Sequence, residues 1–386
     1  MTPSRKSIMA CAKSMTETCN IGRGECVLVK GGTHAQELLE AISLQCYRRG
    51  AVPFLTATSD GYAKAVYDEI PASTLATVPR HLVSAVKDTD TIIIVEELDD
   101  PSIADGFPRD KLVARQKANM PLLDIVYHPK KGKKWLYAGW PTEAAARRYG
   151  VPYRDLQKFI MGGISVPPKK LMSMGKDMAR RFKDARWVHV WDNKGTDFRV
   201  DIGKRRINID DGFVSKADYD IGDRGANLPA GEVFFAPRET VGEGTLYCPI
   251  TQDRMSGKLV KDVRLEFRKG KLLLDRTTAS SNLGQLVASF RECEKLDSKE
   301  YSPVRTMNVA ELGIGFNPRI TRAIGYILTD EKIRGTAHLA FGANKSYGGG
   351  AESVMHWDFV SAPGANIDVE KTNGRTREVM RKGKLV

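Results

Sequence analysis

Apolar and polar positions in the first part of the chain switch between two periods. Residues 26–30 (CVLVK) and 51–58 (AVPFLTAT) are short runs typical of strands. Residues 35–49 between them repeat apolar positions at helical spacing and stop at Gly50. A strand–helix–strand order predicts two parallel strands joined by a crossover helix.

Two further apolar runs extend this pattern. The run at 92–95 (IIIV) is typical of a strand buried in a parallel sheet. Residues 120–128 (MPLLDIVYH) are a further strand candidate. The overall fold class is therefore expected to be α/β, and residues 1–165 are expected to form an N-terminal α/β layered domain with parallel strands.

The pattern changes after the paired prolines Pro167 and Pro168, which are typical of a linker or a sheet edge. Helical spacing returns at 171–185 and again at 280–293. Short strand-like runs lie elsewhere, at 187–203, 205–214, 232–237, 244–250 and 261–277. Within the last of them, Gly270 marks a hairpin turn. Residues 166–386 are therefore expected to form a C-terminal β-rich α+β domain.

Length and composition agree with two globular domains. The chain has 386 residues, more than one ordinary core accommodates. Hydrophobic residues make up 41% and charged residues 28%, as in soluble proteins. The sequence shows no apolar run of the roughly 18 residues that a membrane span needs and no signal peptide. The six cysteines form no CxxC pair and are expected to be reduced thiols. We therefore expect a cytoplasmic protein with no membrane partner.

The net charge of +13 raises the question of a nucleic-acid partner. The basic residues are scattered over several short runs, such as PKKGKK and GKRR, and no known nucleic-acid-binding module accompanies them. Such runs are more often solvated faces. We expect no nucleic-acid partner.

Four stretches in the second half carry candidate metal ligands. They are NLPAGEVFFAP with Glu232, NVAELGIGFNP with Glu311, GTAHLAFGAN with His338, and MHWDFV with His356 and Asp358. A carboxylate in an apolar run needs a partner charge or a metal if it is buried. Each stretch also has a plainer interpretation, namely an exposed strand end for Glu232, a capping carboxylate for Glu311 and a core histidine for His338.

The stretch MHWDFV carries the most specific pattern. In a strand, residues i and i+2 point to the same face, so His356 and Asp358 are expected to lie side by side. Met355, Trp357 and Phe359 would then point to the opposite face and into the core. An imidazole beside a carboxylate is half of a metal site, although a hydrogen-bonded pair without a metal satisfies the same pattern.

Together the four stretches supply two histidines and three carboxylates. That set is too large for one tetrahedral zinc. It fits a dinuclear site in which a carboxylate bridges two ions about 3.5–4 Å apart. Such a site activates water and polarises a carbonyl oxygen, which is the chemistry of amide hydrolysis.

The order EVFFAP, AELGIGFN, AHLAFG and HWDFV resembles the thermophilic aminopeptidase family of metallopeptidases, the aminopeptidase T and aminopeptidase S type. The N-terminal segment from GECVLVKGG to GAVPFL resembles the first domain of that family. The resemblance implies a cytoplasmic, homodimeric exopeptidase that removes N-terminal residues from short peptides with two divalent ions, zinc, cobalt or manganese. It places the metal ligands on Glu232, Glu311, His338, His356 and Asp358.

The same resemblance implies catalytic roles. Tyr347, in NKSYGGG, is the best match to a family tyrosine that stabilises the tetrahedral intermediate. Glu232 or Glu311 is expected to move a proton from the attacking water to the leaving amine.

Two other functions remain open on the same scaffold. The family scaffold is also used by ring-cleaving dioxygenases of dihydroxypyridine type, which hold a single iron. His338, His356 and Asp358 could supply the two-histidine, one-carboxylate set of such an iron site. Glu232 and Glu311 favour the two-metal hydrolase, because an iron site needs neither. A non-catalytic binding protein that keeps the fold is the third possibility, and metal content separates the three.

Overall fold

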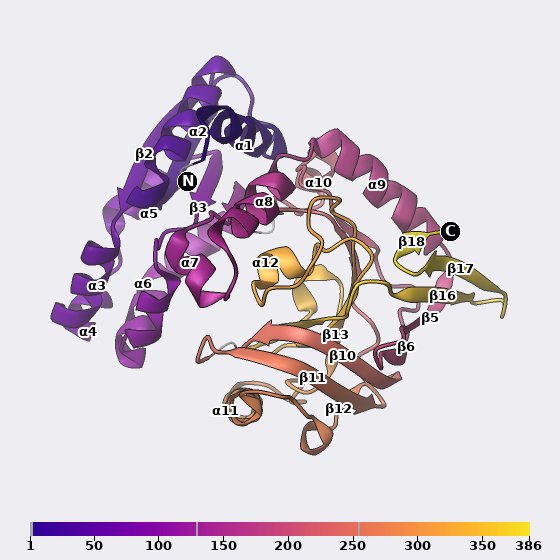
Figure 1. Cartoon of the computed structure of the whole chain (residues 1–386). Coiled ribbons are helices and arrows are strands. Elements are labelled where there is room, and N and C mark those ends of the chain that lie inside the picture. Colours follow the sequence, from indigo (N-terminus) through magenta and orange to yellow (C-terminus); the bar gives the residue numbers. More distant parts are fainter. Residues whose placement is uncertain (1–2, 129, 254) are drawn as a thin grey trace. The chain divides into compact units, whose positions relative to one another are not determined.

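The computed structural model describes residues 3–128, 130–253 and 255–386 (Figure 1). Its internal contacts divide the chain into two compact units. The first unit contains Met1–Pro168 and Gly212–Ala230, and the second contains Lys169–Asp211 and Gly231–Val386. The sequence pattern placed Gly212–Ala230 in the C-terminal domain. The structure groups this segment with the first unit because its strand pairs with the sheet there.

The first unit contains a five-stranded sheet in the order β2-β1-β3-β4-β8, and all its neighbouring strands are parallel. Its strands are β1 (Cys26–Gly32), β2 (Val52–Thr58), β3 (Thr91–Val95), β4 (Lys134–Ala138) and β8 (Gly225–Leu228). Its α-helices are α1 (Arg5–Thr18), α2 (Gln36–Arg48), α3 (Asp60–Glu69), α4 (Ala72–Leu75), α5 (Arg80–Lys87), α6 (Arg109–Val126), α7 (Glu143–Arg148), α8 (Tyr153–Ile164) and α10 (Lys216–Asp220).

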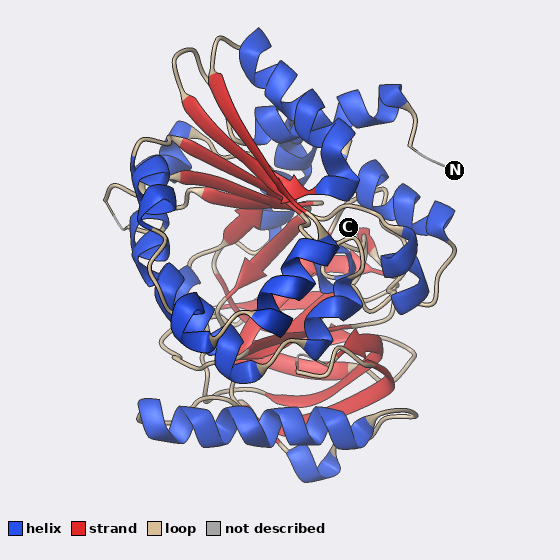
Figure 2. Ribbon diagram, turned by 90° about the vertical axis from the view of Figure 1, so that its left-hand side faces the viewer, coloured by secondary structure: helices blue, strands red, loops and turns tan. Residues whose placement is uncertain are grey.

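Helices cover both faces of this parallel sheet (Figure 2). Leu28 of β1 packs with Val86 of α5 and Leu122 of α6, whereas α2 contacts β1 and β2. The α/β class with parallel strands that the sequence predicts is confirmed. Within the described residues, no helix combines the length and apolar character that crossing a membrane requires.

The strand predicted at residues 120–128 is wrong. Most of this run forms the last turns of α6. Leu122 is buried while its neighbour Leu123 is 38% exposed, so only part of the apolar run faces the core, as on an amphipathic helix. The next strand of the sheet is β4, a five-residue strand that directly follows a lysine-rich run.

The second unit contains two sheets. An eight-stranded sheet has the order β12-β11-β10-β6-β5-β16-β17-β18, and a five-stranded antiparallel sheet has the order β15-β14-β13-β9-β7. The strands of the larger sheet are β5 (Ala185–Trp191), β6 (Asp197–Asp201), β10 (Glu243–Gln252), β11 (Leu259–Arg268), β12 (Lys271–Leu272), β16 (Asn366–Lys371), β17 (Thr376–Arg381) and β18 (Lys384–Leu385). The strands of the smaller sheet are β7 (Asn208–Asp210), β9 (Glu232–Phe235), β13 (Val309–Gly315), β14 (Ala337–Gly342) and β15 (His356–Val360).

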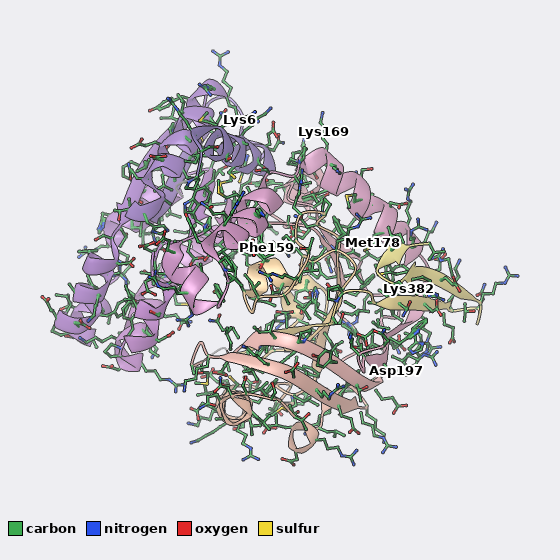
Figure 3. The ribbon with its side chains drawn as sticks, viewed as in Figure 1. Lys6, Phe159, Lys169, Met178, Asp197 and Lys382 are labelled. Atoms are coloured by element: carbon green, nitrogen blue, oxygen red, sulfur yellow. The ribbon has the colours of Figure 1, made fainter. Side chains whose placement is uncertain are left out.

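The α-helices of this unit are α9 (Pro168–Arg181), α11 (Leu283–Glu300) and α12 (Ile327–Asp330). The two helices that the sequence predicts in this unit are present as α9 and α11, and α12 is a further short helix that was not predicted. Figure 3 labels Lys169 and Met178 on α9, of which Lys169 is exposed and Met178 is buried. The predicted hairpin at Gly270 is confirmed, because Arg268 pairs with Lys271 and Gly270 adopts the positive φ that such a turn requires.

One face of the smaller sheet is an aromatic core. The ring of Phe290 from α11 lies 5.2 Å from that of Trp357 and 6.2 Å from that of Phe359, measured between centroids. Phe341 of β14 packs against the same ring. Met355, Trp357 and Phe359 are buried on this side, as the alternation in MHWDFV predicts. The core therefore fixes the back of the strands whose front carries the polar residues.

Phe290→Ala should destabilise the second unit by about 3–5 kcal/mol, because it removes the ring that joins α11 to β14 and β15. Urea unfolding followed by tryptophan fluorescence measures the loss through the neighbouring Trp357. Val354→Ala, at a 48% exposed side chain of the same unit, should change stability by less than about 0.5 kcal/mol. Equal stabilities for the two variants would contradict this account of the core.

Candidate metal centre

The smaller sheet brings all five predicted ligands to one face. Glu232 begins β9, Glu311 lies in β13 and His338 lies in β14, while His356 and Asp358 belong to β15. These positions alternate with the aromatic and aliphatic residues of the opposite face. Pairing of the strands thus brings Glu232 together with ligands that are up to 126 positions further along the chain.

Small residues lie opposite the ligands on the neighbouring strands. The register pairs are Gly315 with Glu232, Gly313 with His338, Gly342 with His356, and Ala340 with both Glu311 and Asp358. At Gly313 the reason is steric, since a Cβ there would lie 2.1 Å from Nε2 of His338. The glycines and the alanine leave room for long polar side chains to cross the face of the sheet.

The first group of ligands is Glu232, Glu311 and His338, all buried. Nε2 of His338 lies 3.3 Å from Oε2 of Glu232 and 3.1 Å from Oε1 of Glu311. Among the described residues, neither Oε2 of Glu232 nor Nδ1 of His338 has a hydrogen-bond partner. An imidazole held between two buried carboxylates marks a place where a cation is needed.

The second group is Glu311, His356 and Asp358. Nε2 of His356 lies 3.2 Å from Oδ1 of Asp358 and 3.8 Å from Oε2 of Glu311. Nδ1 of His356 lies 2.8 Å from the carbonyl oxygen of Ala343 and donates to it. That contact fixes the ring so that Nε2 faces the carboxylates, as in histidines that bind metals.

Charges within the centre favour protonated histidines when no metal is bound. Burial alone would lower the pKa of His338, but the hydrogen bond that its ring donates to Glu311 and the nearby carboxylates raise the pKa to about 9. Burial likewise opposes protonation of His356, but Asp358 and Glu311 raise its pKa to about 10. Burial raises the pKa of Glu232 to about 8, against the charge of Lys332. Protons thus occupy the positions that a metal ion could take, and metal binding would release them.

Tyr347 lies at the edge of the second group, at the end of a short 3-10 turn (Lys345–Tyr347). Its hydroxyl lies 3.2 Å from the carbonyl oxygen of Ala343 and 3.3 Å from Nδ1 of His356. Its ring contacts Phe234 on the same face of the sheet. Burial raises the pKa of Tyr347 far above its usual value, so the phenol remains a neutral donor.

Glu239 holds the loop that carries this tyrosine. Its carboxylate accepts from the backbone N–H of Gly350 at 2.7 Å and from the side-chain amide of Asn344 at 3.0 Å. The guanidinium of Arg205 contacts the same carboxylate at 3.0 Å and also donates to the carbonyl of Gly348. The loop is therefore held by hydrogen bonds before Tyr347, at Asn344, and after it, at Gly348 and Gly350.

The structure adds a buried lysine that gave no signal in the sequence. Lys332 lies in LTDEKIRG, a charged run typical of a solvated turn. Its Nζ lies 2.6 Å from Oε1 of Glu232, 2.8 Å from Asp210 and 2.9 Å from Glu331. Burial would lower the pKa of Lys332, but these three carboxylates raise it well above its usual value. Its ammonium is a fixed cation beside the first group of ligands.

Comparison with known proteins identifies a family and solved structures with a similar fold. A family model described as thermophilic metalloprotease (M29) matches residues 9–385. Wild-type AmpT from Thermus thermophilus is similar over 99% of both chains, with a TM-score of 0.77 and 19% identity. A 2,5-dihydroxypyridine dioxygenase from Pseudomonas putida KT2440 is similar over 100% of this chain and 98% of its own, with a TM-score of 0.60 and 15% identity. No curated protein matches the sequence. At these identities the two structures establish the fold alone.

Gly313→Ala should weaken metal binding at least tenfold, because the added methyl group would collide with the His338 ring and turn it away from Glu232 and Glu311. Competition with a chromogenic chelator measures the affinity. Gly284→Ala in α11 is the matched control, since a Cβ there meets no atom within 4 Å and should leave metal affinity unchanged. A Gly313→Ala protein with unaltered affinity would show that His338 does not bind the metal from this position.

Proposed function

The chain belongs to the M29 family of thermophilic metalloproteases, and we propose that it is an aminopeptidase with two metal ions that acts on short peptides. The observation that carries the two-metal part is the position of Glu311. Its Oε1 lies 3.1 Å from His338 and its Oε2 lies 3.8 Å from His356, so each oxygen faces a different ligand group. A carboxylate shared in this way could hold both ions of a dinuclear site.

The donor set suits two divalent ions. Glu232, Glu311 and His338 would hold one ion, and Glu311, His356 and Asp358 the other. Carboxylates combined with imidazoles accept zinc, cobalt or manganese.

The net charge of the buried carboxylates and of Lys332 also supports two divalent ions. The centre contains the carboxylates of Glu232, Glu311 and Asp358, and Lys332 adds those of Asp210 and Glu331 together with its own ammonium. With neutral imidazoles, five carboxylates and one ammonium leave four negative charges. Two divalent ions balance this excess, whereas one leaves half of it buried and unpaired.

Divalent ions bound there would polarise the scissile carbonyl and lower the pKa of a bound water. The protein's own groups supply the remaining steps. The neutral hydroxyl of Tyr347 is a donor for the oxyanion that develops on the carbonyl oxygen. Glu232 and Glu311 each have an oxygen close to His338, and one of these two carboxylates would move a proton to the leaving amine.

The exopeptidase part of the proposal rests on the similarity of the four ligand-bearing segments to the aminopeptidase T and aminopeptidase S type. The homodimer and the cytoplasmic location implied by the same resemblance stay predictions. Light scattering at micromolar concentration tests the dimer, and a monomer there would remove it.

A single-iron ring-cleaving dioxygenase is the alternative that a specific observation favours, namely the fold shared with the Pseudomonas putida enzyme. It would use His338, His356 and Asp358 as ligands. It does not explain why one oxygen of Glu311 faces His338 and the other faces His356. It also does not explain the buried Glu232, which is paired with Lys332. The two-metal hydrolase explains all of these residues.

The wild-type protein should bind two divalent ions per chain and release N-terminal residues from short peptides. Glu311→Ala should lose both ions, since both groups share this carboxylate, whereas His356→Ala should lose chiefly one. Both variants should lose activity and keep their circular dichroism spectra. Elemental analysis together with a peptide hydrolysis assay measures these effects.

His189→Ala is the matched control for these variants. His189 also faces a carboxylate, that of Asp197 at 2.8 Å, but on the exposed face of the larger sheet. Its loss should change neither metal content nor activity. Full activity in the Glu311 and His356 variants, or one iron per chain with oxygen consumption in the wild type, would refute the two-metal peptidase.

Tyr347→Phe should lower kcat about 10²–10³-fold and leave metal content unchanged, because it removes one donor to the oxyanion and no ligand. Tyr62→Phe, at a 66% exposed tyrosine, should have no effect on kcat. Steady-state kinetics of both variants gives the comparison. A fall in kcat of less than about threefold for Tyr347→Phe would exclude this tyrosine from the reaction.

A further inference from the structure

Lys332 is one of the largest fully buried side chains of the protein, with 1% of its surface exposed. Both backbone polar groups of Lys332, its N–H and its carbonyl, are hydrogen-bonded. The N–H of Lys332 donates to the carbonyl of Thr329 at 3.1 Å, and its own carbonyl accepts from the N–H of Asn317 at 2.9 Å. The lysine thus approaches the centre from a backbone that is hydrogen-bonded, not from a free loop.

The three carboxylates around Nζ come from separate segments. Asp210 ends β7 and pairs in register with Glu232 at the start of β9, while Glu331 adjoins Lys332 after α12. The distances of 2.6–2.9 Å are those of charge-assisted hydrogen bonds. An ammonium has three protons to donate, so these contacts account for its whole donor capacity.

This arrangement divides the two oxygens of Glu232 between two tasks. Oε1 accepts from Nζ of Lys332, and Oε2 faces Nε2 of His338 without a hydrogen bond of its own. With Oε1 held, the carboxylate cannot rotate freely, and Oε2 remains directed at the candidate metal position.

We propose that Lys332 is a positioning residue that holds Glu232 as a one-oxygen ligand of the first metal group. The proposal rests on the two-metal function above, and it assigns to Lys332 a role in metal binding that acts only through Glu232. If Lys332 only formed a structural ion pair, its removal would affect the stability of the fold and would change the metal affinity of both ligand groups equally.

The sign of the effect separates positioning from charge. A fixed cation beside a ligand repels a metal ion, so if Lys332 acted only by its charge, its removal would tighten metal binding. If Lys332 positions Glu232, its removal weakens binding, because the carboxylate is then free to turn away. Losing such an outer partner of a ligand typically costs 10–100-fold in metal affinity.

The test uses the full chain, freed of metal by a chelator and titrated with Zn²⁺ or Co²⁺ against a competing indicator. In Lys332→Met, the affinity of one class of site should fall 10–100-fold, while the other class stays within about threefold of wild type. Because Lys332→Met leaves buried carboxylates unpaired and can impair folding, the double variant Lys332→Met/Asp210→Asn is measured beside it. This double variant keeps the net charge of the cluster and should show the same selective loss.

A cycle with Glu232→Gln tests whether the lysine acts through this glutamate. Adding Lys332→Met to Glu232→Gln should change affinity by less than about threefold, because the ligand that Lys332 positions is already altered. Lys64→Met, which removes an exposed lysine paired with Asp68, controls for the loss of a positive charge and should bind metal as the wild type does.

Three results would overturn the proposal. They are tighter binding in Lys332→Met, equal losses in both classes of site, and wild-type affinity in the charge-matched double variant. These outcomes are independent of the peptidase assay. If the wild type binds metal but cleaves no peptide, the proposed function is wrong. The metal titration then still decides whether Lys332 selectively affects the site that contains Glu232.

Discussion

The architecture of the second unit depends on one electrostatic constraint: carboxylates and imidazoles are buried on the front of a sheet whose back is an aromatic core. Removing a charge from water costs several kcal/mol unless an opposite charge replaces the solvent. Lys332 meets this need for Glu232, and Glu311 meets it for both histidines. Cations must compensate what remains, and protons and divalent metal ions compete for that role.

The sheet can hold buried charges on one face because the pleat directs alternate side chains to opposite faces. On the back, Phe290 and Trp357 exclude water and anchor the strands. On the front, Gly313 and Ala340 provide space where side chains of neighbouring strands would otherwise collide. A one-residue slip of register would exchange the two faces, so the hydrophobic core also fixes the positions of the ligands.

The sequence predicts those parts of the site that have a local pattern. His356 and Asp358 follow from period-two alternation, and Glu232, Glu311 and His338 from polar residues in apolar runs. Lys332 could not be found in this way, because its partners come together only when β7 pairs with β9 and the turn after α12 packs against them. In the fold, residues 120–128 were misassigned because an apolar run with one exposed side looks the same in a short strand and in the end of a helix.

The strand β8 has a consequence for how the chain is made. A ribosome produces residues 169–211, which belong to the second unit, before it produces Gly225–Leu228, which completes the parallel sheet of the first. During that interval β4 is an open edge, and open edges are sites of aggregation. The sheet of the first unit therefore stays incomplete until β8, which is encoded after the beginning of the second unit, has been synthesised. A genetic cut at residue 168 would separate the sheet from its own last strand.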